Sequence, residues 1–320
     1  MANTNNAATV WNCPNYTGEL FLIGANQTPF LNMIGGLQGS RIKLVRDFQF
    51  PLAQPWALES ASQPALTETA SLTAPNPWTY VRGQDVNTVQ IFQRTVSVSY
   101  AKQSVTGQIT ADGTTGLVDG TNAQPVQNEK DFQISAHMRQ IAVNADYTFL
   151  NGAYQQATSA AVAAKSRGII TACSSNTVNA ASAALSKDLI DQLLRTMAGN
   201  GAEFVNPVIF VNALNKQRLS TIYGYAPTDR NVGGVNINTI ETDFAILGVV
   251  WAPHVPAGTL LIADMAFVAP VFLPVPEKGV LFYEELSKTG ASERGQIYGQ
   301  MGLDYGPEEY HGTITSLATT

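Results

Sequence analysis

Apolar residues recur at helical spacing in the middle of the chain, from residue 128 to residue 152. A period of three to four residues is typical of an amphipathic helix that buries one face. The segment ends at Gly152, a residue type that often caps helix C-termini. At ~1.5 Å per residue it predicts a helix roughly 35 Å long, which would form the spine of a large domain. The residues of the apolar face are Ile134, Met138, Ile141, Ala145 and Phe149.

Alternating polar and apolar residues predict two strands closer to the N-terminus. Residues 41–50 begin with the alternating run RIKL, and residues 80–100 contain the run TVSVSY. A period of two is typical of a strand with one buried face. In the second run, Val96, Val98 and Tyr100 would share that face.

The span between these strands, residues 51–78, is rich in proline. Proline removes a backbone donor and breaks helices and central strands, so the span predicts an irregular, extended arm. Ordering its 28 residues costs roughly 1–2 kcal/mol each, or roughly 28–56 kcal/mol in total. We therefore expect the arm to be flexible or to be ordered by a neighbouring subunit. Its prolines are Pro51, Pro55, Pro64, Pro75 and Pro77.

The second half of the chain alternates helix and strand patterns, which is typical of a compact α/β lobe. Ser186 and Gly199 bracket one predicted helix, and Asn212 and Gly224 bracket another. Between them the run PVIFV, residues 207–211, predicts a short buried strand. Further strands are predicted over residues 239–251 and 259–263 and in the runs GVLFYEEL, GQIYGQMGLDY and GTITSL.

Composition adds a requirement for a large buried interface. Hydrophobic residues make up 45% of the 320 residues, enough for a core, but charged residues make up only 13%. That fraction is about half of the usual level of roughly 25%. The net charge is −6, and the densest basic group consists of only three residues, Arg41, Lys43 and Arg46. Electrostatic binding of nucleic acid needs larger clusters of Lys and Arg, so the sequence argues against it.

The N-terminal stretch QTPFLNMIGG, residues 27–36, also has to be buried. From Met1 to Ser40 the only charged side chain is that of Glu19. An exposed apolar segment of this kind would aggregate, so we expect it to pack against neighbouring subunits.

Reactive side chains are few and scattered. His137, His254 and His311 lie far apart in the sequence, and Cys13 and Cys173 are too few for a zinc site or a disulfide framework. We expect two free thiols, with a single bridge between them as the alternative.

No catalytic motif emerges either. Two pairs of adjacent glutamates occur, Glu284–Glu285 and Glu308–Glu309. On a strand the two members of each pair would point to opposite faces, so neither pair would form a general acid/base dyad. The glycine-rich run at residues 106–125 lacks the spacing and the lysine of a phosphate loop. We therefore expect no enzyme activity, cofactor or metal. The sequence also shows no signal peptide and no apolar run long enough for a membrane span, so we expect no membrane association and synthesis in the cytoplasm.

Three short motifs resemble a known family. TPFL with MIG, from Thr28 to Gly35, is similar to the TPFLxxIG element found early in one branch of the major capsid proteins of tailed bacteriophages. DYGPEEYHG, residues 304–312, with Ile314 resembles the last strands of that branch, and ELSKTG, residues 285–290, resembles its ELAKTG turn. Together with the order of the predicted elements, the resemblance covers essentially the whole chain.

The resemblance implies an α+β fold of the Hong Kong 97 type. Two departures from the wider family are visible. Residues 47–101 contain no lysine, so we expect no isopeptide crosslink through the arm, and the TPFL element begins at residue 28, which leaves no room for an N-terminal scaffolding domain. The implied parts are an N-terminal arm (1–40), an E-loop hairpin (41–100), a linker and peripheral domain (101–159) with the spine helix at 128–152, an axial domain (160–265) and a C-terminal β segment returning to the peripheral domain (266–320).

The implied function is that of a major capsid protein, which self-assembles in the host cytoplasm, as pentamers and hexamers, into an icosahedral virion shell around double-stranded DNA without sequence-specific binding. Portal, scaffolding or cement proteins would be further partners. The alternatives are an encapsulin-type compartment and a β-rich polysaccharide-degrading enzyme using Glu284 or Glu308. The expected inter-subunit contact residues are Thr28, Pro29, Phe30, Leu31, Met33, Ile34, Pro55, Trp56, Leu66, Pro75 and Trp78.

Overall fold

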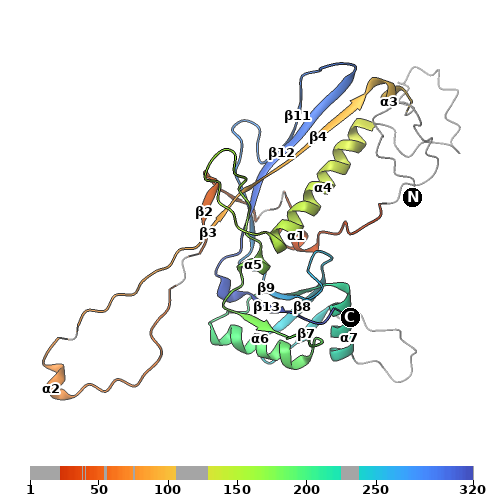
Figure 1. Cartoon of the computed structure of the whole chain (residues 1–320). Helices are drawn as coiled ribbons and strands as arrows, with labels where there is room; N and C mark the ends of the chain where they lie inside the picture. Colours follow the sequence, from red (N-terminus) through yellow and green to blue (C-terminus); the bar gives the residue numbers. More distant parts are fainter. Residues whose placement is uncertain are drawn as a thin grey trace, which may run out of the picture.

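Two β-sheets and a long projecting arm make up the molecule (Figure 1). The computed structural model describes residues 22–37, 39, 41–53, 56–74, 76–105, 129–224 and 238–319. Cys13, Glu19, the predicted linker at 106–125 and nearly all of the loop at 225–238 therefore lie outside the described residues. None of the described helices has the length and hydrophobicity to cross a membrane.

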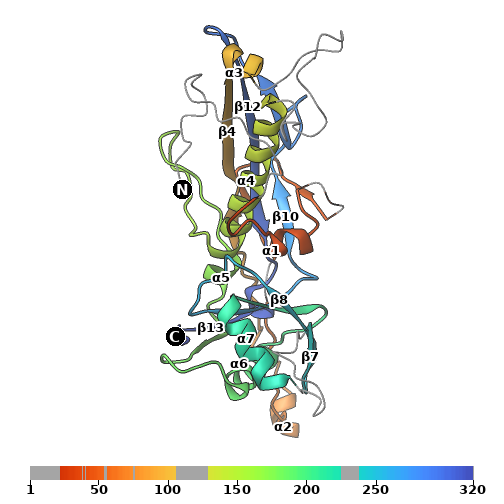
Figure 2. The same ribbon diagram turned by 90° about the vertical axis from the view of Figure 1, so that its right-hand side faces the viewer.

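The first sheet is built around one long strand, β12 (Ser292–Asp304). On one side β12 pairs with the whole of β4, from Ser292 to Met301, and on the other side it pairs with β11 and then with β10, which in turn pairs with β1. The helix α4 runs along β4 and β12 in both views (Figures 1 and 2). The other bounds are β1 Lys43–Leu44, β4 Gln90–Ser99, β10 Ala269–Phe272, β11 Leu281–Glu285, α3 Tyr100–Val105 and α4 Glu129–Asn151.

The second sheet forms the core of a separate lobe, in the order β5-β13-β9-β6-β8-β7. Helices α6 and α7 belong to this lobe and form a cluster of buried residues with part of its sheet. The sheet also contributes Val208, Phe210, Leu261 and Ala263 to the cluster that includes the buried residues of the first sheet. The bounds are β5 Thr177–Asn179, α6 Lys187–Gly199, β6 Pro207–Val211, α7 Ala213–Tyr223, β7 Thr239–Glu241, β8 Ile246–Trp251, β9 Leu260–Asp264 and β13 Gly312–Thr315.

The arm begins and ends at a small two-stranded sheet of β2 (Gln49–Pro51) and β3 (Val86–Thr88). Its far end carries a single helical turn, α2 (Glu68–Ser71). Three more short helices connect the larger elements: α1 (Pro29–Met33), α5 (Ile169–Ala172) and the 3-10 turn η1 (Glu308–Tyr310).

The predicted helices are confirmed, and their ends form as the sequence suggests. The Ser186 hydroxyl accepts a hydrogen bond from Leu189 N–H and starts α6, and the Asn212 side chain accepts one from Asn215 N–H and starts α7. At the end of α4 the Gly152 N–H donates to Thr148 O at 2.8 Å. A side chain at Gly152 would clash with the Ser166 carbonyl, so only glycine fits this crossing.

Several predictions need correction. β1 is only two residues long and Leu44 on it is 64% exposed, because β1 lies at the edge of the sheet. Tyr100 does not share the buried face of Val96 and Val98, since the chain turns into α3 there. The strand predicted over 239–251 is two strands joined at residues 242–245.

The C-terminal segment 266–320 divides between the two sheets. β10, β11 and β12 join the first sheet, but β13 pairs with β5 and β9 in the lobe. The expectation that the whole segment returns to the domain of the spine helix is therefore wrong for β13. The run GTITSL predicts a strand, but its residues do not determine which of the two sheets the strand joins.

The TPFL element lies in the core of its own subunit. Phe30 and Ile34 are fully buried and Leu31 is 2% exposed. The Phe30 ring packs edge-on against Phe210 of β6 at a centroid distance of 5.3 Å. The Leu31 N–H, in the first turn of α1, donates to the buried Asp146 carboxylate of α4 at 2.9 Å.

Replacing Phe30 with Ala should lower the free energy of unfolding of the unassembled subunit by about 3–5 kcal/mol, because it leaves a cavity among packed rings. The matched control is Met33→Ala on the same helix, where the side chain is 37% exposed. Urea unfolding followed by tryptophan fluorescence measures both. Equal, small losses for the two variants would contradict this packing of α1.

The motif histidine His311 is also fully buried. Its Nδ1 accepts the Asp264 N–H at 3.1 Å and its Nε2 donates to Tyr305 O at 2.5 Å, so the neutral ring holds β9 and the chain after β12 together. Burial lowers the pKa of His311 below its ordinary value.

A histidine with a lowered pKa binds fewer protons in the folded state than in the unfolded state. Its stabilising effect is therefore complete above about pH 6.5 and is lost as the pH falls through that value toward the folded pKa. We expect urea unfolding to show falling stability below about pH 6.5. His311→Gln should be less stable but flatter in pH, whereas an unchanged slope in that variant would exclude His311 as the cause.

Candidate functional site: an extended arm and its anchor

Residues 52–85 leave the body of the molecule as a long loop (Figure 1). Antiparallel pairing of Gln49 with Thr88 and of Pro51 with Val86 brings its two ends together. The Leu52 N–H then donates to Asp85 O at 2.9 Å. Beyond this point the described part of the loop contains no strand, and the prediction of an irregular arm is confirmed.

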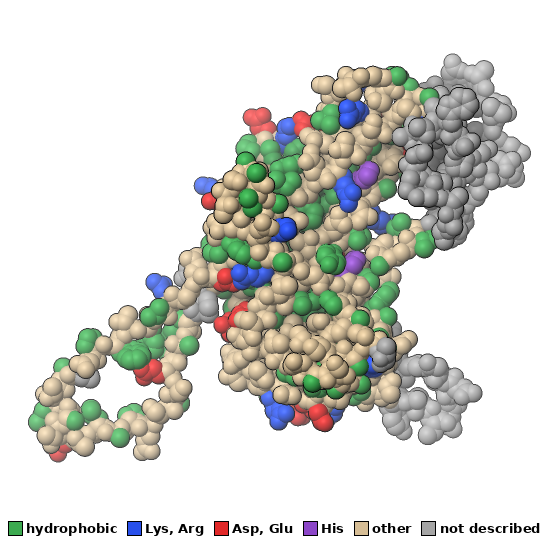
Figure 3. Space-filling view, in the orientation of Figure 1, with side chains coloured by type: hydrophobic (Ala, Val, Ile, Leu, Met, Phe, Trp, Pro, Cys, Tyr) green, Lys and Arg blue, Asp and Glu red, His purple; other side chains and the backbone are tan. Residues whose placement is uncertain are grey.

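The arm carries a concentration of exposed apolar side chains, visible as green patches on an otherwise polar loop in Figure 3. Trp56 is 58% exposed and Trp78 70% exposed. Trp56 contacts Tyr80 edge-on across the loop at a centroid distance of 6.1 Å. The other large exposed side chains of the arm are those of Leu58, Leu66, Leu72, Tyr80 and Val81. A grouping of this kind on a soluble chain marks a surface that another molecule covers.

Charge on the outer part of the arm, residues 56–81, is sparse and of one sign. Between residues 56 and 81 the only ionised side chains are those of Glu59 and Glu68. Glu68 stands in the first turn of α2, which Thr67 caps by accepting the Ala70 N–H at 3.2 Å. Neither glutamate makes an ion pair with any residue that the structure describes.

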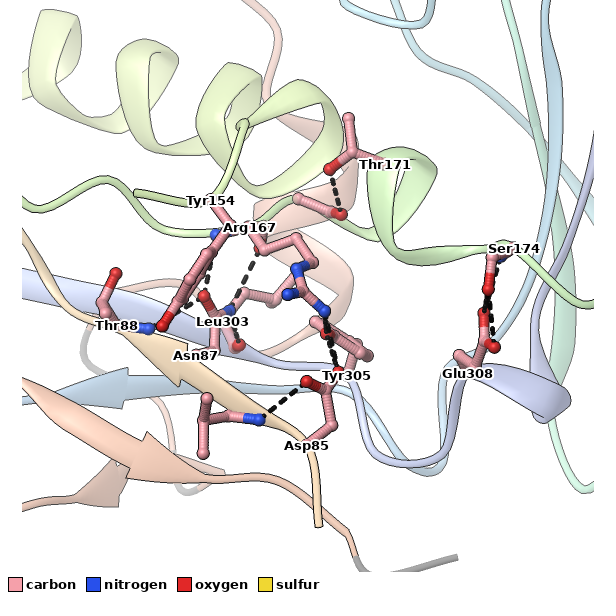
Figure 4. Close-up of polar contacts among 12 residues, drawn as sticks. Asp85, Asn87, Thr88, Tyr154, Arg167, Thr171, Ser174, Leu303, Tyr305 and Glu308 are labelled. Carbon is pink, nitrogen blue, oxygen red and sulfur yellow. Dashed lines mark hydrogen bonds and ion pairs between the residues drawn. The ribbon is translucent and has the colours of Figure 1, made fainter. Parts of the chain in front are cut away.

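A partly buried polar network fixes the base of the arm (Figure 4). The Arg167 Nη1 donates to the Asp85 Oδ2 at 2.8 Å and to the Tyr305 hydroxyl at 3.1 Å, while that hydroxyl donates to the same Asp85 oxygen at 3.0 Å. Burial raises the pKa of the Tyr305 phenol, so the hydroxyl stays neutral and can donate. For Arg167 burial acts to lower the pKa, but the neighbouring Tyr305 and Asp85 oxygens outweigh it and raise the pKa.

The last two residues of β3, Asn87 and Thr88, extend the anchor. The Asn87 side chain donates to Leu303 O at 2.7 Å and to Arg167 O at 3.1 Å, and it accepts the Arg167 N–H at 2.8 Å. The Thr88 hydroxyl donates to Lys165 O at 2.9 Å. The arm therefore leaves a fixed base, although its outer part makes few contacts with the body.

Four of the histidines and glutamates singled out in the sequence have structural partners here: His254, Glu284, Glu285 and Glu308. The His254 Nδ1 lies 2.8 Å from the buried Asp146. Glu284 pairs with Lys278, Glu285 pairs with Lys130, and the Glu308 carboxylate accepts hydrogen bonds from the backbone and hydroxyl groups of the Ser174–Ser175 pair. Within the described ranges no three acidic, His or Cys side chains gather to form a metal site. Cys173 is buried and free.

The predicted contact residues fall into three groups. Phe30, Leu31 and Ile34 are buried in their own subunit and expose no surface to a neighbour, which corrects that part of the prediction. Trp56, Leu66, Trp78 and the partly exposed Thr28, Pro29 and Met33 remain available at the surface. The structure does not describe Pro55 and Pro75.

The sequence did not single out the anchor or several apolar residues of the arm. Arg167 lies 82 positions from Asp85 and 138 from Tyr305, and nothing local marks them as partners. Leu58, Leu72 and Val81 were detectable in principle, because each is a large apolar residue inside the proline-rich span or beside it.

Comparison with solved structures defines the class. The fold is that of the Hong Kong 97-like shell proteins. The chain is similar to the capsid of cyanophage A-1(L) (TM-score 0.64, 11% identity, 96% of each chain covered) and to the capsid of a native GTA particle (TM-score 0.61, 13% identity, 96% of each chain covered). It is also similar to the holo-SrpI encapsulin complex of Synechococcus elongatus PCC 7942 (TM-score 0.57, 10% identity, 98% of this chain and 95% of the other covered).

A match to a protein-family model distinguishes between a viral capsid protein and an encapsulin-type compartment protein. The SU10 major capsid protein family matches residues 3–318, and the chain belongs to this family. A search of curated proteins finds no match. The chain is therefore a structural component of the virion, a major capsid protein that forms the icosahedral head of a tailed phage. The encapsulin and polysaccharide-degrading alternatives are set aside.

Replacing Arg167 with Ala should leave Asp85 and Tyr305 without their shared donor and lower the free energy of unfolding by about 1–3 kcal/mol. The arm should also become more sensitive to chymotrypsin, because its base loses its anchor. Lys187→Ala, which removes an exposed pair with Asp191, is the matched control and should cost at most about 1 kcal/mol. Unchanged cleavage in the arm of Arg167→Ala would contradict the anchoring role.

Proposed function

We propose that the outer part of the arm, residues 56–81, is the main inter-subunit contact of the shell, with the chain arranged as pentamers and hexamers. The observation that carries the proposal is the group of large exposed apolar side chains on a loop whose base is fixed. A rigid base directs the arm outward, and burial of its apolar residues on another subunit would supply the free energy that orders it.

The two sheets suggest a division of roles. The lobe built on the second sheet, with its own core, corresponds to the axial domain that meets copies of itself around the symmetry axes. The first sheet with α4 corresponds to the peripheral domain, and Thr28, Pro29 and Met33 are its further contact candidates.

The remaining partners follow from chemistry. A chain with net charge −6 and pI near 5.1 can enclose double-stranded DNA without adsorbing it tightly, which suits packaging and release. Residues 47–101 contain no lysine, so the arm contacts would be non-covalent. Portal and scaffolding or cement proteins would complete assembly of the head.

The test is the particle mass of the purified protein, by light scattering with negative-stain imaging. We expect closed shells of megadalton mass, or pentamers and hexamers that convert to them. Trp56→Ser with Trp78→Ser should block shell formation, because two exposed anchors of the contact are lost, while changing subunit stability by no more than about 0.5 kcal/mol.

Trp251→Ser is the matched control, since Trp251 is 41% exposed but lies on β8 of the lobe. We expect it to assemble. A wild-type chain that stays monomeric near 34.2 kDa would contradict self-assembly. Assembly of the double variant at wild-type yield would contradict the role of the arm.

A further inference from the structure

One edge of β4 has no strand partner. β4 pairs along its length with β12, and no strand in the described ranges pairs with the opposite edge. An unpaired edge presents a row of backbone donors and acceptors that can bind another extended segment. Soluble proteins usually block such an edge, so a long open one calls for an occupant.

A groove lies beside this edge. It has a volume of about 320 Å³ and runs between five consecutive residues of β4, Gln90 to Arg94, and the adjacent face of α4. Two of its lining side chains are largely exposed although they are apolar or aromatic: Ile91 is 48% exposed and Tyr147 is 55% exposed. Unpaired backbone N–H and C=O groups, exposed apolar side chains and a groove therefore lie together along β4.

Among the residues that line the groove, Arg94 is the only charged one. Residues 86–105 contain no acidic residue, and residues 132–168 contain only Asp146, which is fully buried against His254. Arg94 lines the groove, and Arg139 stands on the exposed side of α4. Neither arginine makes an ion pair with a described residue. In a chain of net charge −6, this is a surface suited to an acidic segment.

The arm offers a matching segment. Residues 56–63, WALESASQ, contain no proline, so each can donate its N–H to a neighbouring strand edge. In an extended conformation Trp56 and Leu58 would face one side, and Ala57 and Glu59 the other. The opposite leg, residues 78–85, is also free of proline but contains Arg82, and its Asp85 is already paired with Arg167.

We propose that residues 56–63 of one copy bind as an added strand along the free edge of β4 of a second copy, with Glu59 facing Arg94. This inference rests on the proposed function of the arm and names the surface that receives it. Strand addition supplies main-chain hydrogen bonds, and the groove receives alternate side chains of the added strand. The charge pair between Glu59 and Arg94 favours residues 56–63 over residues 78–85.

Charge reversal tests the pairing. Arg94→Glu and Glu59→Lys should each place like charges together and lower the yield of closed shells by at least about tenfold, because one unfavourable contact recurs at every subunit of the particle. The double variant, Arg94→Glu with Glu59→Lys, should restore at least about half of the wild-type yield. Arg82→Glu, with the same change of charge on the other leg, should stay within about twofold of wild type.

Sedimentation and negative-stain imaging measure shell yield, and circular dichroism with urea unfolding verifies that each subunit is folded. Loss of assembly in both single variants without rescue in the double variant would overturn the proposal, as would loss in Arg82→Glu. Shells of Arg94→Glu that form normally but retain less DNA would instead assign the groove to the genome. A wild-type chain that forms no shells would contradict the proposed function itself. Failure of the proposed function can therefore be distinguished from failure of the strand-addition proposal, in which the wild type assembles.

Discussion

The body of the subunit depends on one buried carboxylate. Asp146 lies near the C-terminal end of α4 with no solvent exposure, and burial raises its pKa, because a charge without water is unfavourable. Two other segments supply the compensating partners: the Leu31 N–H of α1 and the Nδ1 of His254 in the loop before β9. A charge that must be satisfied in this way joins the N-terminal helix, the spine helix and the lobe at one point. The TPFL element is therefore part of the subunit core.

This arrangement separates stability from assembly. The motifs near the two ends of the chain act inside the subunit, where Phe30 packs on Phe210 and His311 joins β9 to the segment after β12. The arm has little apolar burial of its own and is held only at its base, by the network of Asp85, Arg167 and Tyr305. Large exposed side chains can thus be presented to another copy at little cost to the fold of the body.

The sequence predicts those elements whose signals are local. The spine helix, the caps at Ser186 and Asn212 and the buried strand at 207–211 all depend on the period or the chemistry of neighbouring residues, and they form as expected. The sheet that β13 joins and the partner of Arg167 depend on residues far away in the chain, and no local pattern encodes them. The burial of the TPFL element was misassigned for the same reason. An apolar segment must be covered, but its composition does not tell whether its own core or a neighbour covers it.

Before assembly, the exposed arm is a hazard, because apolar extended segments tend to pair with one another into aggregates. Its prolines limit that pairing, since each removes one backbone donor, and those at 51, 55, 64, 75 and 77 divide the arm into short stretches. Three runs of eight or more residues contain no proline: 56–63, 65–74 and 78–85. Part of the middle run folds into α2, where its N–H groups donate within the turn, and of the other two runs only 56–63 has net negative charge. The same distribution of proline and charge that suppresses pairing between free arms leaves one run able to bind a complementary edge. The specificity of the contact then arises because the other segments of the arm cannot pair with this edge in the same way.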